Sequence, residues 1–466
     1  MENEKKLKKR MTAPHPYVIL LGIILLLAVL TYIIPAGTFD RVQNEAGMNL
    51  VVPGTFHYTE SHPTNFLSIP QLVMRGIVKN VNMVANVLLV GGAFQMVIDT
   101  GALLTASQKL AYRFRTRKYL VICIITTMFA LVVTFSGAVT AIIPFIPVSL
   151  ILCKSLKFEK VTAIAIVMLG GYMGYTAGIT SASNVGAAQL IAELPLYSGM
   201  GMRVALLAIT VITSCAYMIW YEKRVYKNPL KSVYCGIDDP DWNTSSGEVT
   251  DVKMTTRQII VLVVMTAFLG VMIYGLIKWN WDTVQSTGIL ILMGIVCAAI
   301  NGTAPNQIAK SFDAGIRTCC GTAIVIGVAS GVSLILSDAS ILDTIINALA
   351  SVVNHMPNAL KGVAMFLTQS LINFMITSGS GQAAATMPIM TPVADLVGIS
   401  RQSAVLAFQM GDGFSNAILP WAGATAGMVG LANCSFTAWF KYILPLFLIW
   451  TVEGMVLMGV ATMIGY

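Results

Sequence analysis

Charged residues are scarce in this sequence. Only 11% of its 466 residues are Asp, Glu, Lys or Arg, whereas 56% are hydrophobic. Because a soluble domain carries roughly 25% charged residues, this composition excludes a soluble fold. Several apolar runs reach the roughly 20 residues that a helix needs to cross a bilayer, beginning with Tyr17–Ala36. That run lacks a small-residue cleavage site, so we expect a retained helix and not a signal peptide. The sequence predicts an all-α polytopic protein of the cytoplasmic (inner) membrane.

Histidine and paired cysteine are also lacking. The eight cysteines contain no CxxC pair, and the four histidines all lie in predicted loops or interfaces. A catalytic triad or a histidine-based metal centre cannot be assembled in such a core, and structural disulfides or a zinc site are disfavoured. We therefore predict that the protein is not an enzyme and holds no metal or cofactor.

Basic residues fall into clusters that set the topology. They lie at 5–10, 113–118, 154–160 and 223–231, in a chain of formal net charge +8. The positive-inside rule places these clusters, and with them the N-terminus, on the cytoplasmic side. The charge thus reflects orientation in the lipid bilayer, and we expect no nucleic-acid partner. Alternation of sides predicts about nine to eleven transmembrane helices plus two re-entrant hairpins.

Two of the basic clusters are too close together for two ordinary spans. Only the 34 residues Tyr119–Leu152 separate them, with the small polar segment Thr134–Thr140 in the middle. Two spans and a turn need more than about 40 residues, so we expect a hairpin that enters from the cytoplasm and turns back at depth. Such irregular backbone is tolerated where protein or water covers it. Two short spans with a tight outer turn are the alternative.

The second half of the sequence echoes the first. Gly76 corresponds to Gly315 at an offset of 239 residues, and Pro144 to Pro388 at an offset of 244. The recurring segments, in order, are Arg75–Leu103 with Ala314–Leu342, Ser136–Pro147 with Ser378–Pro392, and the broken helices Gly170–Ala188 with Gln409–Gly427. An odd number of spans separates the copies, so we expect opposite orientations. Inverted repeats with helices broken at mid-membrane are typical of secondary transporters.

These boundaries divide the chain into four parts. They are an N-terminal helix and external loop (1–65), repeat 1 (66–221) with a cytoplasmic-side hairpin at 119–152, a cytoplasmic linker (222–256), and repeat 2 (257–466) with an external-side hairpin at 360–398.

The paired Ser-Gly hairpins, the broken helices that end in SASN (Ser181–Asn184) and GDGFSN (Gly411–Asn416), and the single leading helix resemble the ion transporter superfamily. Within it the chain is most similar to the C4-dicarboxylate anaerobic carrier (DcuC-like) family, and there to the YfcC-type branch of basic amino-acid antiporters. The resemblance covers nearly the whole chain. It implies a homodimer in which a transport domain moves against a scaffold, an elevator motion, with sodium coupling in many members. The dicarboxylate/sodium branch has Ser-Asn-Thr at both hairpin tips, whereas the tips here are Ser136-Gly137-Ala138 and Ser378-Gly379-Ser380.

The hairpin tips and helix breaks supply the candidate binding residues. Half-helix N-termini present unpaired N–H groups that suit a carboxylate, and unwound carbonyls and hydroxyls suit a hard cation such as Na⁺. The expected substrate-binding residues are Ser136, Gly137, Asn184, Ser378, Gly379, Ser380, Asp412 and Asn416. The expected ion-binding residues are Thr140, Ser181, Ser183, Thr377 and Ser415. The alternative is that these small residues only permit close helix packing.

Asp412 is the notable charge among these candidates. An intramembrane carboxylate is costly and suggests a function, although it could also act as a local cap. No Lys or Arg occurs in 119–153, 161–201 or 362–400, so a dianion finds no guanidinium. We therefore predict a secondary transporter, a symporter or antiporter, for a small carboxylate-bearing metabolite such as a basic amino acid. A C4-dicarboxylate carrier coupled to Na⁺ or H⁺ is the alternative, and a channel is the rival class.

The expected mechanism needs a fixed scaffold beside the moving hairpins. We expect it to be built from four unbroken apolar runs: Tyr17–Ala36, Val204–Tyr221, Ile259–Ile277 and Thr283–Ile300.

Overall fold

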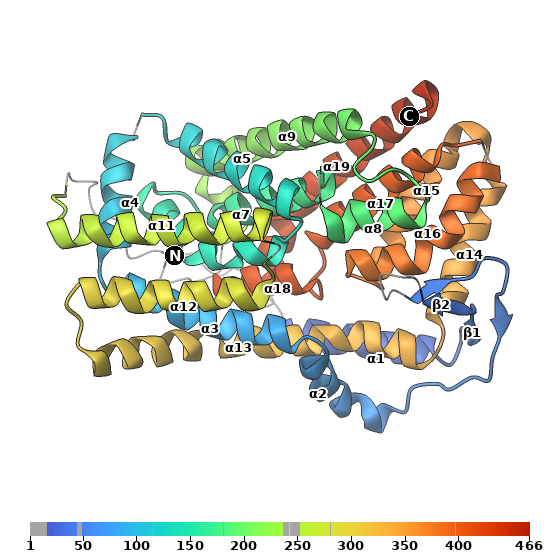
Figure 1. Cartoon of the computed structure of the whole chain (residues 1–466), viewed down its shortest axis with the longest axis horizontal. Coiled ribbons are helices and arrows are strands. Elements are labelled where there is room, and N and C mark those ends of the chain that lie inside the picture. The colour runs from blue at the N-terminus through green and yellow to red at the C-terminus, as the bar shows by residue number, and fades with distance from the viewer. Residues whose placement is uncertain are drawn as a thin grey trace, which may run out of the picture.

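Helices make up most of the computed structural model (Figure 1), which describes residues 16–43, 49–114, 116–179, 181–235, 242, 252–279, 281–396 and 398–466. Within these ranges, seven helices are long and apolar enough to cross a membrane. They are α3 (Val81–Ile98), α5 (Lys118–Ser136), α9 (Met200–Lys227), α11 (Thr256–Lys278), α12 (Thr283–Ile300), α13 (Pro305–Asp338) and α19 (Phe436–Ile464). The predicted total of nine to eleven spans stays a prediction, because the other helices are shorter.

The first helix is shorter than the sequence predicts. Helix α1 (Pro16–Leu30) ends at Leu30, whereas the apolar run continues to Ala36. Residues 31–34 still form helix-like turns, with the Ile34 N–H donating to the Leu30 carbonyl oxygen at 2.9 Å, and Pro35, which has no N–H to donate, ends them. The chain then turns into a short strand, Gly37–Thr38.

One bundle consists of α1, α2 (Ile69–Lys79), α3, α11, α12 and α13. Its helices α1, α2, α3, α12 and α13 lie along the lower side of Figure 1, and α11 lies above α12. At the centre of this bundle, α13 packs against α2 and α3. A Cβ on Gly315 would strike the backbone of Gly91, and a Cβ on Gly76 would strike the backbone of Gly327. Helices α3 and α13 therefore run antiparallel and approach through small residues, as membrane helices do.

The second bundle holds both predicted hairpins. It comprises α5, η2 (Val139–Phe145), α6 (Ile146–Ser155), α7 (Lys160–Ala177), the π-turn η3 (Ala182–Gly186), α8 (Ala187–Ile191) and α9, followed by α15 (Asn358–Asn373), α16 (Gly379–Leu396), α17 (Arg401–Asn416) and α19. Helix α18 (Gly423–Leu431) follows α17 and lies between the bundles, where it packs on α13 as well as on η2 and α7. Helices α5 and α6 pack on α7, and α15 and α16 pack on α17. Every residue of α7 is buried, so α7 and α17 form the centre of this bundle.

The expectation for Val204–Tyr221 is wrong in its packing. This segment belongs to α9, which packs against α7, α5 and α19 and therefore lies with the hairpins. Its apolar composition could not distinguish a scaffold helix from one that encloses the hairpins.

The breaks between helices occur where the sequence placed small residues. Helix α5 ends at Gly137 with φ +69°, and α7 ends at Gly178 with φ +46°. Glycine adopts this left-handed conformation without a steric penalty. Pro144 lies in the returning arm of the first hairpin, and Pro388 and Pro392 lie in that of the second. The predicted segments 119–152 and 360–398 thus correspond to α5–α6 and α15–α16.

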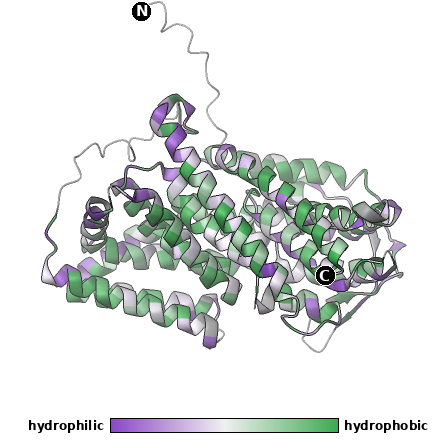
Figure 2. Ribbon diagram, turned by 90° about the horizontal axis from the view of Figure 1, so that it is seen from above, coloured by the Kyte–Doolittle hydropathy of each residue, from purple (hydrophilic) through white to green (hydrophobic). Residues whose placement is uncertain are grey.

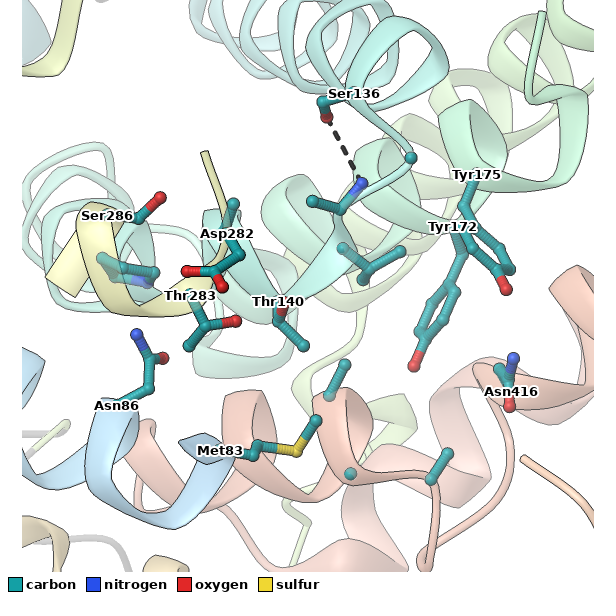
Figure 3. A pocket seen from close by; sticks show the side chains of 18 of the residues that line it. Met83, Asn86, Ser136, Thr140, Tyr172, Tyr175, Asp282, Thr283, Ser286 and Asn416 are labelled. Carbon is teal, nitrogen blue, oxygen red and sulfur yellow. Dashed lines mark hydrogen bonds between the residues drawn. The ribbon is translucent and has the colours of Figure 1, made fainter. Parts of the chain in front are cut away.

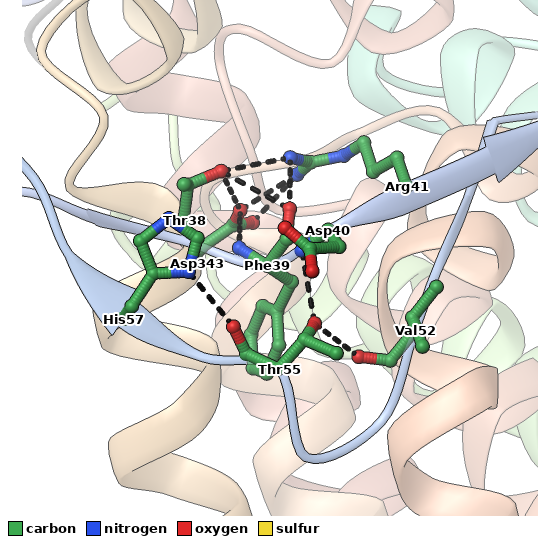
Figure 4. Close-up of polar contacts among 8 residues, drawn as sticks. All are labelled: Thr38, Phe39, Asp40, Arg41, Val52, Thr55, His57 and Asp343. Atoms are coloured by element: carbon green, nitrogen blue, oxygen red, sulfur yellow. Dashed lines mark hydrogen bonds and ion pairs between the residues drawn. The ribbon is translucent and has the colours of Figure 1, made fainter.

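Two further helices connect the bundles: α4 (Ala102–Arg113) and α14 (Leu342–His355). Two short antiparallel strand pairs precede η1 (Phe66–Ser68) and form an N-terminal arm: β1 (Gly37–Thr38) with β4 (His57–Tyr58), and β2 (Arg41–Gln43) with β3 (Asn49–Val51). The arm contacts α14 and α16. Figure 4 shows Arg41 of the arm facing Asp343 of α14, with both guanidinium–carboxylate distances 2.8 Å.

Many helices consist mainly of hydrophobic residues (Figure 2). Large apolar side chains such as Ile259 and Val263 on α11, and Val452 and Val456 on α19, are exposed. In water such surfaces would aggregate, but a bilayer solvates them. The predicted linker 222–256 begins within the last turns of α9 and includes the short turn η4 (Pro229–Lys231). Its residues 236–241 and 243–251 lie outside the described residues.

Candidate functional site

A cavity of about 430 Å³ lies between the two bundles. The first bundle contributes residues of α3 and α12, among them Asn86 and Ser286. The second bundle contributes the first hairpin tip, the tyrosines of α7 and the end of α17 (Figure 3). The volume suits a small molecule. Among its described lining residues Asp282 is charged, and none is Lys or Arg.

Asp412 lies directly behind this cavity and is fully buried. The Tyr175 hydroxyl donates to its Oδ2 at 2.7 Å, and Asn416 Nδ2 donates to its Oδ1 at 2.8 Å. Asn184 Nδ2 lies 3.4 Å from Oδ2. Tyr175 and Asn416 also line the cavity. Two side chains therefore connect the buried carboxylate to the space where a ligand could bind.

Asn373 at the end of α15 holds this arrangement from behind. Its Nδ2 donates to Ser415 Oγ at 2.7 Å, to Asn416 Oδ1 at 3.1 Å and to the Asp412 carbonyl oxygen at 3.1 Å. The first arm of the second hairpin is thereby fixed to the break after α17. Tyr172 adds a link through Thr425, whose hydroxyl donates to the Asn416 carbonyl oxygen at 2.7 Å.

The first hairpin tip forms part of the cavity wall. Ser136, Gly137 and Thr140 all line it, as does Thr377 next to the second tip. Ser136 Oγ accepts from the Ala138 N–H at 3.3 Å (Figure 3). These four predicted residues and Asn416 therefore meet in one place.

Of the three residues at the second hairpin tip, Gly379 is the one that packs against Tyr175 and Asp412. Gly379 is buried, and a Cβ there would strike the Tyr175 hydroxyl and lie 2.8 Å from Asp412 Oδ2. Ser378 and Ser380 are exposed and are not among the described cavity-lining residues. Ser378 Oγ instead accepts from the Gly381 N–H at 3.4 Å, a local cap of α16.

Several buried oxygen atoms around the breaks lack a hydrogen-bond partner within the described residues: Ser181 Oγ, Asn184 Oδ1, Asn373 Oδ1, Gln382 Oε1 and Gln409 Oε1. Unpaired buried acceptors are costly, and oxygen atoms are the ligands of hard cations. These residues fit a site for Na⁺ by their chemistry. The side chain of the predicted Ser183 lies outside the described residues.

The sequence predicts Thr283–Ile300 as part of the scaffold but does not single out Tyr172, Tyr175 or the lining residues of α3 and α12. A tyrosine within an apolar helix looks like a core aromatic, but its hydroxyl needs a partner when buried. A tyrosine in an apolar, buried helix therefore indicates a polar partner, and Tyr172 and Tyr175 could have been predicted on that ground. Asn86 and Ser286 lie on apolar helices far from either tip in sequence, so only the packing brings them to the site.

A family model and two curated relatives match nearly the whole chain. The family described as DcuC, C4-dicarboxylate anaerobic carrier, matches residues 13–463. A protein of Escherichia coli (strain K12) named "Putative basic amino acid antiporter YfcC" is 29% identical, with 99% of each chain covered. An uncharacterized protein of Haemophilus influenzae is 22% identical, with 96% of each chain covered.

Two solved structures are also similar. The YdaH transporter of Alcanivorax borkumensis has a TM-score of 0.43 at 17% identity, covering 97% of this chain and 99% of that chain. Neisseria gonorrhoeae MtrF has a TM-score of 0.42 at 13% identity, covering 99% and 97%.

The family match spans nearly the whole sequence, and the described helices include seven of membrane-spanning length and composition. The protein is therefore an integral membrane protein and a transporter, not an enzyme. Because the family match runs from residue 13 to residue 463, the chain belongs to the C4-dicarboxylate anaerobic carrier (DcuC) family.

Proposed function

We propose that this protein is a secondary active transporter that carries a basic amino acid across the cytoplasmic membrane. The observation that carries the proposal is the cavity between the bundles: its described lining has no Lys or Arg, and Tyr175 and Asn416 link it to the buried Asp412. A substrate with one carboxylate and more than one cationic group matches this charge pattern. The name of the Escherichia coli relative, a basic amino acid antiporter, points to the same class.

The two ends of an amino acid find different partners in this cavity. The substrate carboxylate would bind at the first hairpin tip, where the hydroxyl groups of Ser136 and Thr140 line the cavity. The α-ammonium group would bind the hydroxyl groups of Tyr172 and Tyr175 and the Asn416 side chain, with Asp412 as the countercharge. Hydrogen bonds that involve a charged group are stronger than neutral ones, so these contacts would provide much of the affinity.

We propose an elevator mechanism with two re-entrant hairpins in inverted repeats. Its support is the antiparallel packing of equivalent elements. Gly178 approaches Gln409 where Tyr175 meets Asp412, so α7 and α17 run in opposite directions, as α3 and α13 do. In this mechanism the hairpin bundle carries the substrate along the α3–α12–α13 wall. The coupling ion is Na⁺ or H⁺, and the functional unit is a homodimer with cytoplasmic N-termini.

A C4-dicarboxylate is the second candidate substrate, because the family's description names it. A dianion in this cavity would lack a Lys or Arg partner among the described lining residues. Bound Na⁺ at the unpaired oxygens of Ser181, Asn184 and Gln409 would have to supply the positive charge. The two candidates therefore differ in their expected sodium requirement.

A thermal-shift screen of the purified protein tests the proposal. Arginine, lysine and ornithine should raise the unfolding temperature in a saturable way, whereas succinate and fumarate should not. Each compound is tested in sodium and in choline buffer. Stabilisation by succinate in sodium alone, with none by any basic amino acid, would support the dicarboxylate candidate and reject ours.

A further inference from the structure

We propose that the α3–α12 wall of the cavity is a separate subsite for the distal cationic group of the substrate, an ammonium or a guanidinium. This inference rests on the proposed function and extends it. The subsite consists of Asn86 on α3 with Asp282 and Ser286 at the start of α12. Figure 3 shows these three side chains on the side of the cavity opposite Tyr172 and Tyr175.

Unused hydrogen-bonding atoms mark this wall as a binding surface. Asn86 and Ser286 are each only 3% exposed, yet Asn86 Oδ1 and Ser286 Oγ have no partner within the described residues. Leaving a buried polar atom unpaired costs roughly 1–3 kcal/mol. Because both residues line the cavity, a bound donor would remove that cost.

The hydrogen bonds fix which end of the Asn86 amide is free. The Thr287 hydroxyl donates to the Thr283 carbonyl oxygen at 2.6 Å, so toward Asn86 it can only accept. Asn86 must therefore turn its Nδ2 toward Thr287, at 2.7 Å, and leave Oδ1 as an unpaired acceptor. An acceptor binds a cationic donor and repels a carboxylate.

Asp282 gives this wall a negative charge. Its Oδ1 accepts from the Val284 N–H at 2.7 Å, which caps α12. The positive end of a helix dipole is equivalent to about half a unit charge, so the full charge of the carboxylate exceeds it. The wall therefore favours cations even though a helix begins there.

The neighbouring Trp281 favours an organic cation over a bare metal ion. It lines the same cavity, and an indole ring attracts ammonium and guanidinium groups over its face. Na⁺ prefers a shell of oxygen ligands only. Both Na⁺ and an organic cation would use Asn86, Asp282 and Ser286, so the experiment separates them.

The subsite has a consequence for transport, because it belongs to the first bundle and the tyrosines belong to the second. When the bundles slide past each other, the distal group loses Asn86, Asp282 and Ser286 while the amino-acid end stays with Tyr175. The affinity for a basic amino acid should then be higher on the side where the cavity includes this wall than on the other side.

The test compares arginine with citrulline, which has a neutral ureido group in place of the guanidinium. Initial rates of both are measured in proteoliposomes for the wild-type chain, Asp282→Asn and Ser286→Ala. Asn caps a helix as well as Asp does, so Asp282→Asn removes only the charge. The matched control is Asp313→Asn, an exposed carboxylate of α13 that pairs with Arg317.

We expect Asp282→Asn to raise the KM for arginine about tenfold, equivalent to about 1.4 kcal/mol, and to leave citrulline within about twofold. Ser286→Ala should act in the same direction, and Asp313→Asn should change neither. If Asp282→Asn changes the KM for arginine and for citrulline equally, or changes neither, the subsite is overturned. In that case the proposed function still stands as long as the wild type transports arginine. If the variants instead change the sodium dependence of arginine and citrulline transport alike, the wall binds Na⁺, and the subsite for an organic cation is again overturned. If the wild type transports no basic amino acid, the proposed function and the subsite both fail.

Discussion

At the residue scale, Asp412 is the group around which the candidate site is organised. Its carboxylate is fully buried, yet Tyr175 and Asn416 bond it at 2.7 and 2.8 Å and extend to the cavity. A buried charge persists only when it is hydrogen-bonded or paired, and the partners of Asp412 among the described residues are neutral donors. That leaves the negative charge available to a cationic substrate or to a coupling ion.

Removing the charge or its link to the cavity should stop transport. We expect Asp412→Asn and Tyr175→Phe each to lower arginine uptake at least about tenfold, because each removes a charge-assisted hydrogen bond. Uptake is measured in proteoliposomes, and folding is checked by thermal unfolding in detergent. Tyr58→Phe, at a 68% exposed position of the N-terminal arm, should behave as wild type. Wild-type uptake by both site variants would remove Asp412 from the mechanism.

The second hairpin tip should tolerate a methyl group at one glycine and not at another. A Cβ on Gly379 would strike Tyr175 and Asp412, whereas one on Gly381 meets Ser378 at 3.3 Å. We expect Gly379→Ala to destabilise the fold by about 1–3 kcal/mol and to abolish uptake. Gly381→Ala should keep both properties, as measured by urea unfolding and uptake. Equal activity of the two variants would show that the tip does not close on Asp412.

Part of this site was predictable from the sequence, and part was not. Asp412, Asn416 and Gly137 stood out because charge, amide and glycine are unusual in apolar helices. Tyr175 did not, because its ring resembles any buried aromatic and its partner is far away in sequence. Ser378 shared the polarity of the true lining residues, but the direction in which α16 begins leaves it exposed.

At the element scale, the N-terminal arm connects α1 of the first bundle to the connecting helix α14 and to α16 of the second bundle. Arg41 binds both oxygens of Asp343, which also accepts from the Phe39 N–H at 3.1 Å. Asp343 is 4% exposed, so water does not replace these contacts. The sequence predicted an external loop here, but the pairing of positions about 300 residues apart could come only from the fold.

Breaking this contact should loosen the arm. We expect Asp343→Asn to lower the free energy of unfolding by about 1–3 kcal/mol, and to speed proteolysis within the arm. Asp313→Asn in α13 should cost less than about 1 kcal/mol, because its pair with Arg317 is exposed. The measurements are urea unfolding and limited proteolysis. Equal stability of the two variants would mean that the arm is not anchored through Asp343.

At the scale of the whole molecule, the cavity exists because two bundles meet there. The hairpin pattern and the offset of 239 to 244 residues predicted which segments correspond. The apolar runs that the sequence predicted for the scaffold included Thr283–Ile300, which is α12 of the opposite wall, but also Val204–Tyr221, which belongs to α9. Apolar spans look alike in sequence, and α9 joined the hairpins whereas α12 joined the wall.

Locking the bundles together should block transport reversibly. Met83 of α3 lies beside Gly423 of α18, so a Cβ on Gly423 would touch its side chain. We expect the double variant Met83→Cys/Gly423→Cys to lose at least about 90% of its uptake on oxidation, since an elevator needs the bundles to slide. A reductant should restore uptake. The single variants are the controls, and full uptake by the oxidised, cross-linked protein would exclude the sliding motion.

Counterflow in proteoliposomes tests the central claim most directly. Vesicles that hold the wild-type protein are loaded with unlabelled arginine and diluted into a trace of labelled arginine. We predict transient accumulation of label that saturates with concentration, is abolished by Asp412→Asn and does not occur with succinate. Accumulation with succinate and none with arginine, or linear flux without accumulation for either, would contradict a carrier for basic amino acids.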